Sequence, residues 1–259
     1  MTQWRVLYRK ELLEMIRNYK VMWIPLVFML LGVMQPISSY YMPEILDNFG
    51  GLPEGAIIEM PLPTGAEVLM GVLSNYGMLG VLILVLSAMG IVSAEKQSGV
   101  LGTVMSKPVP HSSYILSKWA GLVTITLLSL FIGYIASWYY TNLLIESVTA
   151  ERVFQSFAIY SIWLIFVVTL TLFFSTVMKG NGSVAFMTIL IVAVLSTVTS
   201  IMENKMKWSP ATLTNHTGYL LQSGELQSSF LPAFLNTIAL IILVLFFTIQ
   251  IFKHKEFRE

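Results

Sequence analysis

Six long stretches of mainly apolar residues dominate the pattern along the chain. They run over residues 21–41, 68–94, 119–141, 154–178, 184–202 and 231–252. A helix needs roughly 20 such residues to cross a bilayer. The pattern therefore predicts an all-α membrane protein with six transmembrane helices in a single domain, residues 1–259.

The six stretches differ in how strongly their composition favours insertion into a membrane. Residues 231–252 are the clearest, because fifteen of them are Leu, Ile, Phe or Val, which favours insertion by about 4.5 to 9 kcal/mol. Residues 184–202 are the weakest, because Ser and Thr crowd their second half.

Residues 2–20 are charged but patterned. Apolar and aromatic side chains, among them Trp4 and Leu12, fall on one helical face, and basic side chains, among them Arg5, Arg9 and Arg17, lie on or near the other. This pattern is typical of a helix lying in the membrane interface. The alternative is a cytosolic helix packed on its own protein.

Residues 94–118 separate the second and third stretches. Val100, Leu101, Val104 and Met105 recur at helical spacing. Pro108 and Pro110 would end that helix, and Ser112 or Ser113 could cap the next one. We expect a short amphipathic helix over 95–106 that takes force from a partner protein. The alternative is that its apolar stripe is buried against the N-terminal helix.

Two other connections are long. Residues 42–67 contain five acidic residues and no basic one, namely Glu44, Asp47, Glu54, Glu59 and Glu67. This loop is either simply solvated or a docking surface for a cation or peptide. Residues 203–230 mix aromatic, Leu, Ser and Thr residues, and Ser209-Pro210 fits a helix start. We expect short re-entrant helices there, before the sixth span.

Basic residues predict the orientation. With the N-terminus inside, the inner segments hold twelve Lys or Arg and the outer loops three, a strong positive-inside bias. Both termini and residues 94–118 are then cytoplasmic. Composition agrees with a membrane protein: 56% of residues are hydrophobic and 11% charged, against about 25% charged in soluble domains. The first span does not resemble a cleavable signal and should remain as an anchor in a plasma membrane, which we expect to be bacterial.

Several kinds of chemistry are disfavoured. The chain has no Cys and no G-x-x-x-x-G-K-[ST] motif, so we expect neither a thiolate site nor ATP hydrolysis by a phosphate-binding loop. Its three histidines lie on different segments, which argues against a shared metal site. No charged residue falls at mid-span, which disfavours an ion-coupled carrier. We therefore expect no catalytic residue, metal or cofactor in this chain.

The spans carry small hydroxylated residues instead. These can hold helices together, or they can line a weakly polar translocation surface. The residues that would form such a surface are Asn75, Thr124, Thr169, Ser196 and Thr197. In addition, Gly32, Gln35 and Pro36 in the first span and Asn75 and Gly77 in the second suggest a kinked or closely packed pair.

Residues 94–118 carry a resemblance to a known family. They read Glu95-Lys96-x-x-Gly99-x-Leu101, then Met105-Ser106-x-Pro108-Val109, then Ile115-Leu116-x-Lys118. With six spans and an N-terminal interfacial helix, this resembles the permease subunit of an ABC-2 type transporter, the type V exporter fold. Val100, Gly102 and His111 depart from the usual pattern.

The resemblance implies a mechanism. Two permease subunits, identical or paralogous, would pair above two separate ATP-binding subunits that hold ATP and Mg²⁺. The expected helix over 95–106 would act as a coupling helix. It and its flanking residues would contact the ATPase through Glu95, Lys96, Gly99, Leu101, Val104, Met105, Pro108, His111 and Lys118. The expected function is export of an amphipathic compound such as a drug, antimicrobial peptide or lipid. The alternative is a membrane sensor or immunity protein that binds a lantibiotic or wall precursor without moving it.

Overall fold

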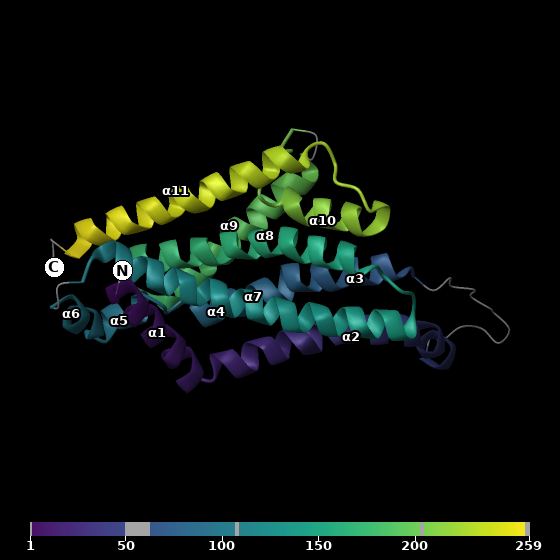
Figure 1. Ribbon diagram of the computed structural model, residues 1–259, viewed down its shortest axis with the longest axis horizontal. Helices are drawn as coiled ribbons and strands as arrows, with labels where there is room; N and C mark the ends of the chain where they lie inside the picture. Colours follow the sequence, from purple (N-terminus) through teal and green to yellow (C-terminus); the bar gives the residue numbers. More distant parts are fainter. Residues whose placement is uncertain (1, 50–62, 107–108, 203–204, 257–259) are drawn as a thin grey trace.

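A computed structural model describes residues 2–49, 63–106, 109–202 and 205–256. Within these ranges the chain is helical and contains no β-strand. Six helical segments are long and apolar enough to cross a membrane, which confirms six candidate spans. They form one elongated bundle (Figure 1).

The first half of the chain contains the first three spans. Helix α1 (Thr2–Arg17) precedes α2 (Lys20–Phe49), the first span. The second span is divided into α3 (Gly65–Asn75), a π-helical turn η1 (Tyr76–Gly80) and α4 (Val81–Ala88). Two short helices, α5 (Ser93–Gln97) and α6 (Val100–Met105), lead to α7 (His111–Leu144), the third span.

The second half is simpler. The fourth, fifth and sixth spans are α8 (Ala150–Val177), α9 (Asn181–Ile201) and α11 (Phe230–Glu256). Helix α10 (Thr212–Ser223) lies between the last two, which agrees with the helix expected within 203–230. The helices extend beyond several predicted stretches because polar residues at their ends can continue a helix without lying in hydrocarbon.

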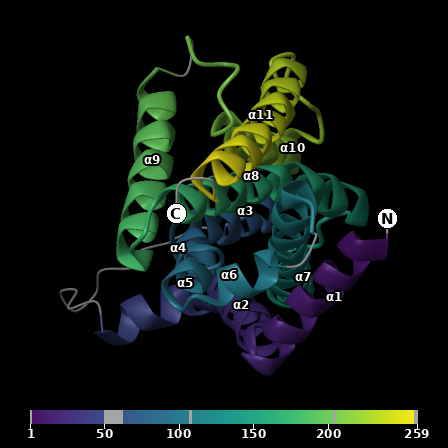
Figure 2. The ribbon, with the colours of Figure 1, turned by 90° about the vertical axis from the view of Figure 1, so that its left-hand side faces the viewer.

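Helix α8 lies at the centre of the bundle. It contacts α7, α9, α10 and α11, and two thirds of its most apolar window is buried, 67%. Figure 2 looks onto the end that carries α5 and α6 and shows α9 at one side of the bundle and α1 at the other. The start of α1 and the end of α11 lie at this same end (Figure 1).

Glycines bring α2 and α7 into close contact. A Cβ on Gly133 would lie 2.6 Å from the backbone oxygen of Phe28, and one on Gly32 would lie 2.5 Å from the backbone oxygen of Gly133. The Tyr76 hydroxyl fills the same place and donates to Phe28 O at 2.8 Å. Small residues allow such close approach of helices in membranes.

The predicted close pairing of the first two spans is confirmed by a side-chain contact. Asn75 Nδ2 donates to Gln35 Oε1 at 3.0 Å, and helices α2 and α3 are in contact. The amide pair satisfies two polar groups that would otherwise face hydrocarbon. Asn75 therefore joins the first two spans.

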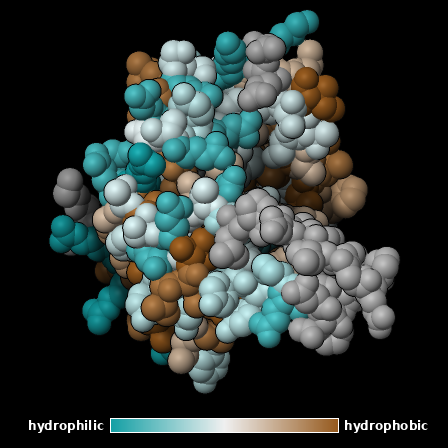
Figure 3. Space-filling view, turned by 90° about the vertical axis from the view of Figure 1, so that its right-hand side faces the viewer, coloured by the Kyte–Doolittle hydropathy of each residue, from teal (hydrophilic) through white to brown (hydrophobic). Residues whose placement is uncertain are grey.

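The end opposite α5 and α6 presents many hydrophilic side chains (Figure 3). Of the acidic loop, residues 50–62 lie outside the described residues. Glu67 has a local role, because its carboxylate and the Thr64 side chain form a capping box at the start of α3. The Glu146 carboxylate also accepts from the Gly65 backbone, at 3.1 Å. These two acids stabilise a helix start.

Candidate functional site at the α5–α6 end of the bundle

The segment expected as one helix over 95–106 is broken into α5 and α6. Gly99 lies between them at φ +73°, a left-handed conformation that costs other residues roughly 1–2 kcal/mol. Continuous helix was thus the wrong prediction, because Gly99 favours a turn. Gly102 is different: it lies within α6, and a Cβ there would meet nothing within 4 Å.

A second break separates α5 from α4, and Ser175 of α8 stabilises it. The Ser175 hydroxyl accepts from the backbone N–H groups of Val92 and Ser93, at 3.0 and 3.1 Å, and donates to Met89 O at 2.9 Å. One hydroxyl therefore satisfies three backbone groups that the break leaves without helical partners. Helix α5 is a separate short element held against α8.

A cluster of charged side chains and one tyrosine lies where α5 meets α1 and α7. It comprises Lys10, Glu11, Glu95, Tyr114 and Lys118, and we call it the Lys118 cluster. Lys118 Nζ lies 2.9 Å from Glu95 Oε1 and 3.1 Å from Glu11 Oε1. The side chains of Lys118 and Glu11 are 1% and 5% exposed, so these charges are withdrawn from water.

Two further groups complete the Lys118 cluster. The Tyr114 hydroxyl donates to Glu95 Oε2, and Lys10 Nζ lies 3.0 Å from Glu95 Oε1. Burial alone would lower the pKa of Lys10, but the carboxylates of Glu11 and Glu95 outweigh it and hold that pKa above its ordinary value. An isolated buried charge would incur a desolvation cost of several kcal/mol, and the oppositely charged partners offset part of that cost.

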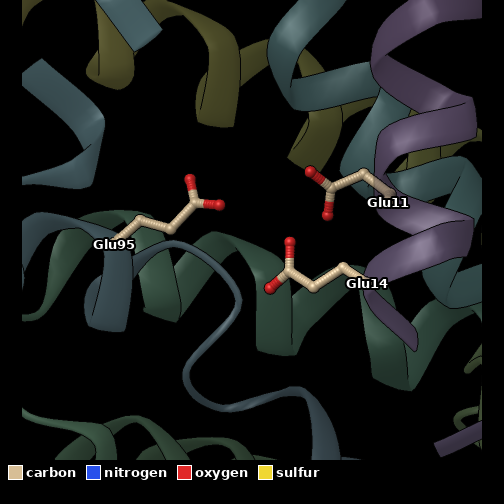
Figure 4. A group of neighbouring side chains, drawn as sticks. All are labelled: Glu11, Glu14 and Glu95. Atoms are coloured by element: carbon tan, nitrogen blue, oxygen red, sulfur yellow. The ribbon is translucent and has the colours of Figure 1, made fainter. Parts of the chain in front are cut away.

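Three carboxylates point toward one another here, from Glu11 and Glu14 on α1 and from Glu95 on α5 (Figure 4). Such a group could ligate a cation such as Ca²⁺. However, the Lys10 ammonium lies 3.0 to 3.5 Å from an oxygen of each. The chain thus supplies its own cation to this group.

Lys96 and Gln97 connect α5 to the other side of the bundle. Lys96 Nζ donates to Thr176 O of α8 at 2.5 Å and lies 5.9 Å from the ring centroid of Phe252 on α11. Gln97 donates to the backbone oxygen of Lys179. Through three consecutive residues, α5 therefore contacts α1, α7, α8 and α11, as well as the turn after α8.

The remaining expected coupling residues are dispersed around this junction. Leu101 is half-buried against the core, whereas Val100 is 44% exposed. His111 packs edge-on against Phe252, with ring centroids 5.8 Å apart. Pro108 and the side chains of Val104 and Met105 lie outside the described residues.

The start of α7 departs from the sequence-based expectation. Pro110 occupies the N-cap, without a side-chain hydrogen bond, and neither Ser112 nor Ser113 caps the helix. Proline with extended backbone geometry can precede a helix without supplying a capping oxygen. Lys118 follows two turns later and points into the protein interior rather than toward a partner surface.

Helix α1 packs on its own protein along one edge. Glu11 and Met15 are buried, and Tyr8 forms a 2.7 Å hydrogen bond with Thr124 of α7. A Cβ on Gly121 of α7 would lie 3.1 Å from the Met15 methyl group, so this glycine admits the helix. The expected interfacial residues Trp4, Arg5, Arg9 and Arg17 are exposed, and Leu12 is half-buried.

The five residues expected on a translocation surface have different surroundings. Asn75 pairs with Gln35, Thr124 with Tyr8, and Thr169 accepts from Trp119 Nε1 at 2.9 Å. These three join helices. Ser196 borders a cavity between α8, α9 and α10, and Thr197 is exposed. The structure does not bring the five onto one wall.

Sequence reasoning missed several residues of this junction: Lys10, Glu11, Tyr114 and Phe252. A signal for Glu11 did exist, because Lys118 opens a membrane span and a cation there requires an acidic partner. No comparable signal in the sequence pointed to the aromatic residues Tyr114 and Phe252. Phe252 of α11 stacks on Tyr114 of α7, with ring centroids 5.1 Å apart. The two residues lie 138 positions apart in the sequence.

Comparison with known proteins agrees with this architecture. Residues 5–222 match the family model described as ABC-2 family transporter protein. The chain is also 35% identical over 250 residues to the uncharacterized transmembrane protein YxlG of Bacillus subtilis (strain 168), covering 96% of this chain and 97% of that protein. The chain is a multi-pass membrane protein and belongs to the ABC-2 family of transporter proteins.

Proposed function

We propose that this chain is the membrane-spanning permease subunit of an ABC exporter of the type V fold, and that a separate ATP-binding subunit drives it. The observation that carries this proposal is the position of α5. Glu95, Lys96 and Gln97 contact four other helices and the turn after α8. A displacement of α5 would therefore reach α1, α7, α8 and α11 together.

The ATP-binding subunit would dock on α6 and the adjoining turn. Val100 and Gly102 are exposed there, and Gly99 turns the chain between α5 and α6. ATP and Mg²⁺ would be bound by the partner. Closure of two such partners would bias the permease between states, provided that each state makes different contacts with α5 and α6.

The membrane arrangement follows from the same proposal. The end with α5, α6 and both chain termini would face the cytoplasm, where ATP is available, and the end with α10 would face outward. Trp4 and the exposed arginines of α1 would lie in the headgroup region of the plasma membrane. A second copy or a paralogue would complete the translocation pathway, and an amphipathic compound would be the substrate.

The test uses the whole chain, purified together with a candidate ATP-binding subunit from the same organism and reconstituted in proteoliposomes. The chain alone should show no ATPase activity, and the complex should hydrolyse ATP. Val100→Asp should abolish complex formation, because it places a charge at the proposed contact. Leu226→Asp, at an equally exposed apolar residue beyond α10, should leave the complex intact.

Two results would contradict the proposal. One is ATP hydrolysis by the chain alone at the rate of the complex. The other is a wild-type complex with Val100→Asp. If the protein instead senses a lantibiotic or wall precursor without moving it, the outcome differs. Cells would then keep wild-type resistance to that compound when the ATP-binding subunit is catalytically inactive.

A further inference from the structure

A cavity of 380 Å³ lies among α3, η1, α8, α9 and α10, at a distance from the Lys118 cluster along the bundle. Its size falls at the lower end of ligand pockets, roughly 300–1,000 Å³. Apolar lining comes from Leu73, Met78 and Trp163, and neutral polar lining from Ser74, Tyr160 and Thr214.

The backbone makes room for this cavity. The π-helical turn Tyr76–Gly80 interrupts the second span beside it, and such turns occur frequently at functional sites. Gly77 borders the cavity without a side chain: a Cβ there would meet only the Tyr160 hydroxyl, at 3.5 Å. A larger residue at 77 would therefore extend into the space.

The polar groups around the cavity are all uncharged. No Lys, Arg, Asp, Glu or His borders it among the described residues. A charged ligand group would therefore find no counter-ion among the lining residues, so an uncharged head group fits the cavity better. By contrast, a second cavity of 460 Å³ on another side of α10 is bordered by Lys207 and His216.

Two hydroxyl groups at the cavity have already committed their protons. Tyr160 donates to Leu73 O at 2.8 Å, and Thr214 donates to Ala211 O at 2.7 Å. A hydroxyl oxygen that donates its proton still has lone pairs that can accept. These two lining groups therefore favour a ligand that brings a hydrogen-bond donor, while the Asn215 amide at the rim of the cavity can both donate and accept.

We propose that this cavity binds an uncharged amphiphile with an alkyl chain and a hydroxyl head group. The chain would lie against Leu73, Met78 and Trp163, and the head group would donate to Tyr160 or Thr214. Charged amphiphiles of the same length would bind more weakly. This site belongs to the isolated subunit and does not depend on an ATP-binding partner.

The experiment uses the full-length chain in phosphatidylcholine nanodiscs and a diazirine derivative of octanol as photolabel. Labelled peptides are identified by mass spectrometry. Labelling of the peptides containing Met78 and Trp163 should be saturable and should be displaced by excess octanol. Octanoate and octylamine at the same concentration should displace it poorly, because each carries a charge.

Gly77→Leu should lower this labelling about tenfold, since loss of room for even one methylene can weaken binding that much. Gly182→Leu is the matched control, because a Cβ there meets nothing within 4 Å, and it should label like the unmodified chain. Ser196→Leu fills the cavity from α9 and should repeat the effect if Gly77→Leu fails to fold.

Labelling that does not saturate, or that is spread evenly over the lipid-facing helices, would overturn the site. Equal displacement by octanol and octanoate would overturn the ligand class. Both results come from the unmodified chain and so do not depend on any variant folding. They also do not bear on the exporter proposal, because no ATP-binding subunit is present.

Discussion

Lys118 and Glu95 form a 2.9 Å ion pair between α7 and α5, with the lysine side chain 1% exposed and the glutamate 12%. Glu95 lies two residues before the end of the second candidate span, and Lys118 lies near the start of the third. The pair therefore ties together the two ends of the segment that contains α6. It also joins that segment to α1, because Lys118 contacts Glu11 as well.

Lys118→Met should destabilise the chain by about 3 kcal/mol, because removing one partner of a buried pair leaves uncompensated charge. Glu11 and Glu95 would then share only Lys10. Thermal unfolding in detergent should show the loss as a lower midpoint. Lys179→Met removes a lysine from an exposed position and should melt like the unmodified chain; equal midpoints for the two variants would refute the prediction.

Glu95→Gln should reduce ATP-driven transport about tenfold or more, the size of a typical coupling free energy between sites. It removes the charge that holds Lys10 and Lys118 while keeping the shape of the side chain. Transport by proteoliposomes containing the complex would measure the effect. Glu14→Gln, at a 47% exposed side chain that contacts only Lys10 in the cluster, should transport normally, and similar rates for both variants would count against a coupling role.

Gly99→Ala and Gly102→Ala should change stability in opposite directions. Alanine at 99 must adopt φ +73° and should cost about 1 kcal/mol. Alanine at 102 lies within α6 with open space around it and should stabilise by up to about 1 kcal/mol. Denaturant unfolding of the two variants would compare them; the same sign for both would contradict the assigned turn.

Gly133→Ala should destabilise the contact of α2 with α7 by about 1–3 kcal/mol. The new Cβ would lie 2.6 Å from the Phe28 backbone oxygen, and backbone cannot move aside as a flexible side chain can. Gly182→Ala adds the same methyl group in open space. A lower thermal midpoint is expected for Gly133→Ala alone, and a drop for both variants would point to a general effect of alanine instead.

Much of the fold could be predicted from the chain because membrane spans are long and uniform. Six apolar stretches correspond to the six candidate spans, and α10 appears where turn and helix-start residues predicted a short helix. The contact between Gln35 and Asn75 was also foreseeable, since a polar amide in a span requires a partner. Each of these follows from composition or spacing over a short window.

The candidate site was less predictable. Glu95, Lys96 and Lys118 were singled out from residues 94–118, but their contacts with Lys10, Thr176 and Phe252 join distant parts of the sequence. The break of the expected helix at Gly99 was missed because a single glycine lowers helix propensity only by about 1 kcal/mol. The left-handed backbone at Gly99, with φ +73°, ends α5 there, and glycine adopts it without strain.

The class of protein, the number of spans and the segment most different from them could all be predicted from the amino-acid sequence, because hydrophobicity and helix period are local properties of the chain. The packing of the helices, in contrast, directs Lys118 inward to Glu11 and Glu95 and brings Ser175 of α8 to the break before α5. Those contacts depend on which helix faces meet, and the faces are selected by close packing at residues such as Gly121 and Gly133.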